Sequence, residues 1–230
     1  LKKTKFYQAS TSELFGEKPN KVNSFDENSL MVPKSPYGVS KLFSYYMTKV
    51  YREAYGFYAC NGILFNHESP RRGETFVTRK ITMFFAKKIL CSRDILYLGN
   101  LNAKRDWGHA KDYVEAMWKI LQQKKPEDYV IATGKQYSIR VFTNIVCKKL
   151  GFDISWKGKG INEKGFINSG KKTIIEIDKN YFRPLDVNTL LGNANKARKK
   201  LKWKPKYDLY SLIDEMILSE YLSFNEIEKK

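Results

Sequence analysis

Tyr37 and Lys41 are a pair of residues whose types and spacing could carry out proton transfer. They lie four residues apart near the start of a predicted helix, and residues at i and i+4 share one helical face. A phenol is a poor base at neutral pH, and a nearby ammonium group favours its ionised form. The pair could therefore take a proton from a hydroxyl group. A surface lysine beside a half-buried tyrosine is the commoner explanation when the pair stands alone.

A second group follows the first predicted strand directly, and it consists of Ser10, Thr11, Ser12 and Glu13. Ligands of open α/β sheets bind at the carboxyl ends of the strands, where hydroxyls and a carboxylate could hold and deprotonate a sugar. Ser or Thr followed by Glu is also a helix-capping pattern. Each group alone is a weak signal. The two together, in this order and one loop apart, indicate an active site more strongly.

Two further segments carry basic side chains, and the first of them directly follows a predicted strand. Asn66–Gly73 has the adjacent arginines Arg71 and Arg72 in a loop bounded by Pro and Gly, which suits a phosphate-rich ligand. His67 taken by itself would be a structural residue. Arg105–His109 holds a charged pair and an aromatic residue before a helix, and a buried salt bridge that anchors a turn is the alternative.

Alternating strands and helices must position these groups. We expect strands at residues 6–10, 58–65, 95–98, 129–132 and 173–177, and helices at 36–55, 77–90, 110–123, 138–150 and 209–224. Ser35 and Pro36 form a helix start, and Gly56 and Gly151 mark helix ends. This alternation predicts an α/β fold with parallel connections. Beyond residue 151 the pattern loosens into a glycine-marked polar stretch that we expect to be mobile.

The composition indicates a globular chain. The 230 residues are 42% hydrophobic and 14% aromatic, which argues against disorder, and no apolar run approaches the length of a bilayer span. Three cysteines at wide spacing (Cys60, Cys91 and Cys147) argue against a disulfide framework or a zinc cluster, and two histidines argue against a metal site built from histidines, so we expect no metal. We therefore expect a soluble, cytoplasmic protein.

The net charge of +18 raises nucleic acid as a possible partner. However, only nine of the 42 basic residues are arginines, and the lysines are spread along the chain. We interpret the densest run, residues 196–206, mainly as a solvated face. An anionic small substrate fits this charge equally well, and we expect no nucleic-acid or membrane partner.

The strand, glycine-rich turn and helix that open a complete nucleotide-binding α/β domain are missing from the sequence. Lys157–Gly165 is rich in glycine, but Glu163 occupies the position of the third glycine. We expect the chain to be part of a longer protein.

Eight stretches of the chain resemble the GDP-mannose 4,6-dehydratases, a family of extended short-chain dehydrogenases/reductases. They are QASTSELFGE, SPYGVSK, NGILFNHESPRRG, FVTRKI, LGNLNAKRDWGHAKDYVEAMW, YVIATG, YFRP and LKWKPK. The likeness runs from about Phe6 to Phe224 and covers the later part of the family's chain. The NHESPRRG and AKRDWGHAKDYVEAMW blocks separate this family from related sugar-nucleotide enzymes.

The resemblance implies an α/β fold built on the C-terminal portion of a Rossmann-like parallel sheet, with a smaller mixed α/β substrate-binding domain. Residues 1–150 would be the remaining part of the NADP-binding domain, interleaved with substrate-binding elements. Residues 151–230 would be mainly substrate-binding. The family also implies a homodimer or homotetramer, with the Arg71–Arg72 loop reaching a neighbouring subunit's cofactor.

The resemblance further implies an internal redox cycle on GDP-mannose, with NADP as the cofactor. Tyr37 would be the base on the 4-hydroxyl, Thr11 would hydrogen-bond that hydroxyl, and Lys41 would stabilise the phenolate. Glu13 would remove the C5 proton while water leaves from C6. The cofactor-binding residues would be Tyr37, Lys41, His67, Arg71 and Arg72. The substrate-binding residues would be Ser12, Asn66, Val77, Lys80, Arg105, Arg183 and Asp186. The last of these stands where relatives commonly carry Glu.

Three other functions remain open at the level of sequence. A related epimerase or reductase would share the Tyr37 and Lys41 pair but would not need a carboxylate at Glu13. A catalytically incomplete fragment could act as a sugar-nucleotide binding or assembly module. A nucleic-acid-binding protein would need a focused arginine-rich stripe, which the sequence lacks.

Overall fold

The computed structural model describes residues 4–17, 24–88, 94–167, 170, 172–181 and 187–227. The chain divides into two compact units, each assembled from three stretches. The first unit comprises Leu1–His67, Lys104–Gln136 and Val187–Asp208, and the second comprises Glu68–Ala103, Tyr137–Asp186 and Leu209–Lys230. The expected division at residue 150 concerns what each part binds, and it stays a prediction.

A parallel three-stranded sheet forms the centre of the first unit. Its strands are β1 (Phe6–Thr11), β2 (Ala59–Leu64) and β7 (Tyr129–Ile131), in the order β1-β2-β7. All six residues of β2 are buried, as expected for the central strand of a parallel sheet covered on both faces. The parallel strand pairing and the alternation of strands with helices confirm the predicted α/β fold.

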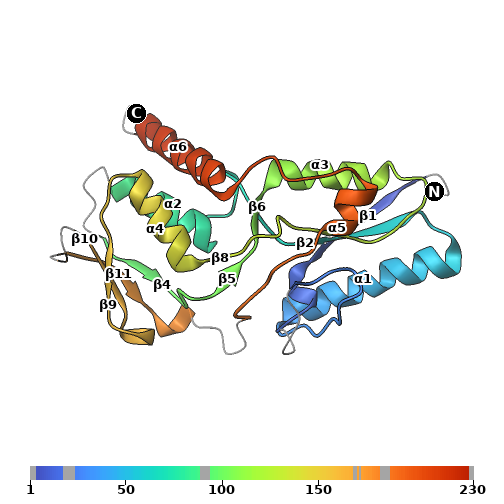
Figure 1. The fold of residues 1–230 in the computed structure, drawn as a ribbon, viewed down its shortest axis with the longest axis horizontal. Helices are drawn as coiled ribbons and strands as arrows, with labels where there is room; N and C mark the ends of the chain where they lie inside the picture. The colour runs from blue at the N-terminus through green and yellow to red at the C-terminus, as the bar shows by residue number, and fades with distance from the viewer. Residues whose placement is uncertain are drawn as a thin grey trace. The chain divides into compact units, whose positions relative to one another are not determined.

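Helices α1 (Pro36–Tyr55) and α3 (Ala110–Leu121) lie on opposite faces of this sheet (Figure 1). Both ends of α1 were predicted correctly: the Ser35 side chain caps the first turn, and Gly56 ends the helix with a φ of 66°. Short elements complete this unit: η1 (Ser12–Leu14), β5 (Lys104–Arg105), β6 (Trp107–His109) and α5 (Asn195–Lys200). β3 (Asn66–Glu68) begins in this unit and pairs with β6.

Two buried aspartates fasten the last stretch of the first unit to the rest of that unit. Asp106 accepts a hydrogen bond from the backbone N–H of Gly192, at 3.3 Å. Asp112 accepts hydrogen bonds from the backbone N–H groups of Lys206 and Tyr207, at 3.0 and 3.1 Å. Each carboxylate takes up donors that would otherwise be buried without partners.

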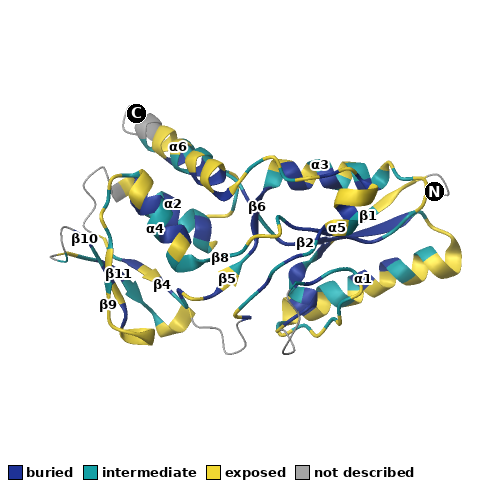
Figure 2. Ribbon diagram, viewed as in Figure 1, coloured by how far each residue is buried: buried dark blue, intermediate teal, exposed yellow. Residues whose placement is uncertain are grey.

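The second unit contains a four-stranded sheet and three helices that pack on one another. The strands are β4 (Leu96–Leu98), β11 (Lys172–Ile177), β10 (Lys164–Ile167) and β9 (Ser155–Lys157), and only the β4–β11 pair is parallel. The helices are α2 (Val77–Lys88), α4 (Ile139–Lys149) and α6 (Leu209–Ile227), with β8 (Tyr137–Ser138), η2 (Gly160–Asn162) and η3 (Lys179–Tyr181) as short elements. Each of these helices carries buried residues, among them Phe85, Phe142 and Ile213, and Figure 2 shows buried segments on α2 and α6.

The expectation of a mobile polar stretch beyond residue 151 is wrong where β9 and β10 lie. Gly165 marks close packing in this sheet, because a Cβ there would lie 3.1 Å from the side chains of Ile175 and Trp156. Gly158, with a φ of +88°, makes the turn after β9. The glycines therefore serve a short antiparallel sheet.

Cys60 and Cys147 are buried free thiols, and Cys91 lies outside the described residues. Among the residues that the structure describes, no group of His, Cys, Asp and Glu is arranged to hold a metal ion. The helices in these same ranges are too short or too polar to cross a membrane.

Candidate active site

Thr11 and Glu13 lie where β1 ends and the chain turns into η1. The Thr11 side chain caps this short helix by accepting a hydrogen bond from the Glu13 backbone N–H, at 3.3 Å. The capping interpretation of this segment is therefore correct. A capping role for Thr11 is also compatible with a ligand-binding site. The cap holds Glu13 at the carboxyl end of a parallel strand, where ligands of such sheets bind.

The Glu13 carboxylate is joined to the start of α1. Its Oε2 accepts a hydrogen bond from the Ser35 hydroxyl at 2.8 Å. The same Ser35 oxygen accepts a hydrogen bond from the Gly38 backbone N–H at 2.9 Å. Ser35 is predictable from sequence as a helix cap, but its contact with Glu13 spans 22 residues and has no local signal.

Tyr37 and Lys41 lie on one face of α1, as their spacing predicts. The Lys41 Nζ is 5.8 Å from the centroid of the Tyr37 ring. Lys41 also donates a hydrogen bond to the backbone carbonyl of Ala9 at 2.9 Å, which ties its ammonium group to β1. The Tyr37 side chain is 51% exposed, so its phenol is open to a ligand. The first unit thus brings together all four residues that we expect to be catalytic.

Three other predicted residues, Ser12, Asn66 and His67, belong to the same unit and differ in how far they are exposed. Ser12 is only 3% exposed, so it offers a ligand little surface in this conformation. His67 has its Nδ1 2.9 Å from the Phe65 carbonyl oxygen and its ring stacked on Tyr113, with centroids 4.9 Å apart. These contacts fit a structural histidine. Asn66 is partly exposed at the start of β3.

Arg105 and Asp106 do not form the salt bridge that we weighed for this turn. Arg105 donates a hydrogen bond to the Val187 carbonyl at 2.7 Å. Asp106 instead accepts hydrogen bonds from the backbone N–H groups of Thr133 and Gly134, both at 2.9 Å. Burial raises the pKa of Asp106, and these hydrogen bonds oppose that effect only in part. Arg105 is therefore bound to a backbone carbonyl, whereas Asp106 binds backbone N–H groups.

In the second unit, Arg72 is held within its own loop. Its Nε lies 3.1 Å from the buried carboxylate of Glu68, and its guanidinium group lies 3.6 Å from the centroid of the Phe76 ring. Thr78 also donates a hydrogen bond to Glu68, at 2.7 Å. Burial raises the pKa of Glu68, against the opposing effects of Arg72 and Thr78. Arg71, by contrast, is exposed.

The remaining predicted substrate residues belong to the second unit. Lys80 donates a hydrogen bond to the Tyr97 carbonyl at 2.8 Å, and its Nζ lies 4.0 Å from the centroid of the Tyr181 ring. Val77 is partly buried as the first residue of α2. The predicted residues Arg183 and Asp186 lie outside the described residues.

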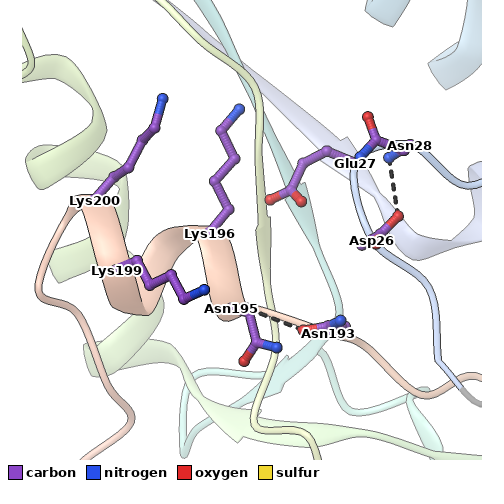
Figure 3. A pocket seen from close by; sticks show the side chains of 8 residues that line it. All are labelled: Asp26, Glu27, Asn28, Asn193, Asn195, Lys196, Lys199 and Lys200. Atoms are coloured by element: carbon purple, nitrogen blue, oxygen red, sulfur yellow. Dashed lines mark hydrogen bonds between the residues drawn. The ribbon is translucent and has the colours of Figure 1, made fainter.

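The first unit has an open hollow of about 440 Å³ whose lining includes none of these residues. Its lining is Asp26, Glu27, Asn28, Asn193, Asn195, Lys196, Lys199 and Lys200 (Figure 3). Two of its lysines are engaged by Glu127, with Lys196 at 2.9 Å and Lys200 at 2.6 Å. This pairing leaves the hollow with little net positive charge, although three lysines face it.

The sequence pattern of the family described as "GDP-mannose 4,6 dehydratase" matches residues 1–216. This chain belongs to that family. The GDP-mannose 4,6 dehydratase of Dictyostelium discoideum is 54% identical over 220 residues, and the GDP-mannose 4,6-dehydratase of Vibrio cholerae serotype O1 is 51% identical over 232 residues. Each match covers 95% of this chain and 61% of the relative. The chain therefore spans about three fifths of the length of these family members.

Solved structures of two other proteins share the fold of this chain. RMD from Pseudomonas aeruginosa, complexed with NADPH, has a TM-score of 0.77 at 16% identity over 95% of this chain and 66% of its own. dTDP-glucose 4,6-dehydratase from Bacillus anthracis, in complex with NAD, has a TM-score of 0.76 at 21% identity over 96% of this chain and 63% of its own. Identities this low establish the Rossmann-like fold alone.

Proposed function

We propose that this chain carries the catalytic residues of a GDP-mannose 4,6-dehydratase, a hydro-lyase that converts GDP-mannose to GDP-4-dehydro-6-deoxy-mannose and water. The observation that carries the proposal is the grouping of Thr11, Glu13, Tyr37 and Lys41 at the end of one parallel strand. Membership of the family and about 50% identity to its dehydratases support the choice of reaction. A related epimerase would not require Glu13.

The same residues fit a nicotinamide cofactor. The phenol of Tyr37 is half exposed, and the ammonium group of Lys41 is fixed by a backbone carbonyl at the strand edge, where it can bind a ribose hydroxyl. NADP, when bound, supplies the hydride acceptor for C4 and the hydride donor for C6. RMD, which shares the fold, is complexed with NADPH, and the exposed guanidinium group of Arg71 suits an additional phosphate.

Proton transfers by the chain's own residues account for the rest of the reaction. Tyr37 takes the proton of the 4-hydroxyl, Thr11 hydrogen-bonds that oxygen, and Lys41 stabilises the phenolate. The C4 carbonyl then acidifies C5, whose proton passes by way of Glu13 to the C6 hydroxyl, which leaves as water. Hydride addition at C6 and transfer of the proton held by Tyr37 to C5 give the product. One water is lost and no cofactor is consumed.

Further parts of the proposal concern binding and assembly. Asn66, Lys80 and Arg105 contact the substrate, together with Ser12, Val77, Arg183 and Asp186. The exposed Arg71 reaches a neighbouring subunit in a homodimer or homotetramer. The free thiols of Cys60 and Cys147 fit a reducing cytoplasm.

Incubation of the full-length protein with GDP-mannose and a catalytic amount of NADP+ tests the reaction. Mass spectrometry is expected to show a product lighter by one water. An isomer of unchanged mass would indicate an epimerase, and a requirement for stoichiometric reduced cofactor would indicate a reductase. Unchanged GDP-mannose with a cofactor-loaded protein would rule out the proposed activity.

A further inference from the structure

We infer that Ser35 is a positioning residue that orients the Glu13 carboxylate for removal of the C5 proton. This inference rests on the proposed function, because it assigns a partner to the base of the elimination step. None of the residue roles proposed above includes Ser35.

The hydrogen-bond inventory of a serine hydroxyl supports the assignment. A hydroxyl has one hydrogen to donate and lone pairs to accept with. The Ser35 oxygen accepts from the Gly38 backbone N–H at 2.9 Å, so its orientation is fixed by the first turn of α1. Its hydrogen is then directed to the Glu13 Oε2, at 2.8 Å. A hydrogen bond to an ionised carboxylate is among the stronger kinds in proteins.

The hydrogen bond from Ser35 restricts the motion of the Glu13 side chain, which must be held in place to remove the C5 proton. The Glu13 backbone is held by the Thr11 cap, but a glutamate side chain has three rotatable bonds. Binding of Oε2 by Ser35 restricts the rotation of the side chain and the position of the carboxylate. Among the described residues, the Glu13 Oε1 has no hydrogen-bond partner, so it is the oxygen presented to the substrate.

A close backbone approach supports the same coupling independently. A Cβ on Gly38 would lie 3.0 Å from the Glu13 carbonyl oxygen and 2.9 Å from the Pro33 Cβ. The first turn of α1 therefore packs directly on the segment that carries Glu13. The Ser35 hydroxyl therefore ties the Glu13 carboxylate to the turn that carries Tyr37, while Tyr37 itself is positioned by the helix.

The test uses Ser35→Gly in the full-length, NADP+-loaded protein. Glycine is tolerated at a helix N-cap with little loss of stability, so this variant removes the donor while α1 still starts at the same residue. In a single turnover we expect cofactor reduction to change by less than about twofold, because Tyr37 is untouched. We expect the elimination step to slow by about 10- to 100-fold, with reduced cofactor and 4-keto sugar accumulating.

Two matched variants separate positioning from helix capping. Ser35→Thr keeps the hydroxyl and is expected to restore elimination. Ser138 caps α4 in the same way, through the Val141 N–H at 3.2 Å, and it has no carboxylate partner among the described residues. Ser138→Gly is therefore expected to leave both steps unchanged. Equal slowing of reduction and elimination in Ser35→Gly would overturn the inference and assign Ser35 a purely structural role.

A second measurement decides the inference without turnover. The ¹³C resonance of the Glu13 carboxyl, assigned with Glu13→Gln, is expected to shift in Ser35→Gly and to stay in place in Ser35→Thr and Ser138→Gly. If the protein does not dehydrate GDP-mannose, the proposed function fails, while this resonance still reports the contact. An unchanged Glu13 signal in Ser35→Gly would refute the positioning role even in an active dehydratase.

Discussion

Tyr37 and Glu13 belong to different elements, and we expect their loss to stop the reaction at different steps. Tyr37→Phe removes the base for the 4-hydroxyl, so reduced cofactor should not form. Glu13→Gln leaves that base intact, so reduced cofactor should form and persist while elimination slows by about 10²- to 10⁴-fold. Absorbance of the reduced nicotinamide in a single turnover measures both outcomes.

A second tyrosine of α1 provides the control for this pair. Tyr46 is 52% exposed and has no proposed role in proton transfer, so Tyr46→Phe should behave as the unmodified protein. If Tyr37→Phe and Glu13→Gln are both blocked before cofactor reduction, the division of roles between the two residues is wrong.

Asp128 is expected to make stability depend on pH in the acid range. Burial alone would raise its pKa, but hydrogen bonds and charge from Arg52 (2.7 and 2.8 Å) outweigh burial and hold the pKa below its ordinary value. A carboxyl group whose pKa is lower in the folded than in the unfolded state stabilises the fold at pH values above its unfolded-state pKa. This stabilisation is lost as the pH falls through the folded-state pKa. Asp128→Asn should lower the free energy of unfolding by about 3 kcal/mol at pH 7.

Urea unfolding measured from pH 7 down to pH 2 checks the sign of this effect. The difference between the unmodified protein and Asp128→Asn should be largest near neutrality and should shrink below about pH 4. A difference that grows as the solution is acidified would contradict the role given to Asp128.

Gly62 and Tyr7 show how tightly the central elements pack. A Cβ on Gly62 would clash with the Tyr7 hydroxyl oxygen, so Gly62→Ala should cost about 1 to 3 kcal/mol of unfolding free energy. The Tyr7 hydroxyl is buried and has no hydrogen-bond partner among the described residues, and burial raises its pKa. Tyr7→Phe should therefore be neutral or stabilising. Thermal unfolding of both variants measures this, and a large loss in Tyr7→Phe would mean that the hydroxyl has a partner.

The sequence predicted those elements whose ends carry local signals. Ser35 and Gly56 mark the ends of α1, and the buried apolar run of β2 could be recognised without knowledge of its neighbours. β9 and β10 were missed because each has at most four residues and their pairing depends on residues distant in the chain. In sequence, a short strand that contains glycine for close packing looks the same as a glycine-containing loop.

In the candidate site, too, contacts within one element could be predicted from the sequence, whereas contacts between distant segments could not. Helical spacing predicted that Tyr37 and Lys41 lie together, since both belong to one helix. The contact of Ser35 with Glu13 depends on how a loop folds back, so spacing gave no sign of it. The sequence also could not show that Arg71 is exposed while Arg72 is held in place, because Arg72 is held by its ion pair with the buried Glu68.

At the scale of the whole molecule, Arg71 and Arg72 are expected to affect assembly differently. Arg71 is exposed, whereas Arg72 is held by Glu68 and Phe76. Arg71→Ala should weaken NADP+ binding about tenfold and lower the oligomeric state without changing the thermal midpoint. Arg72→Ala should lower the thermal midpoint first, because it leaves the Glu68 carboxylate buried without its charged partner.

Light scattering and cofactor titration on the two variants test this difference. Lost cofactor affinity with an unchanged oligomer in Arg71→Ala would confine the loop to its own subunit. An unchanged thermal midpoint in Arg72→Ala would contradict the structural role of that residue.

The division of each unit into three stretches has a consequence for how the protein is made. The first unit needs residues 187–208, because Asp106 and Asp112 bind backbone groups from that stretch and Trp203 is buried in the core. While the ribosome is still adding residues 137–186 of the second unit, residues 187–208 are absent, and the part of the first unit's core that they cover stays exposed. Chaperones that shield apolar surface on nascent chains would act during this interval, which ends only when the chain has emerged beyond Tyr207.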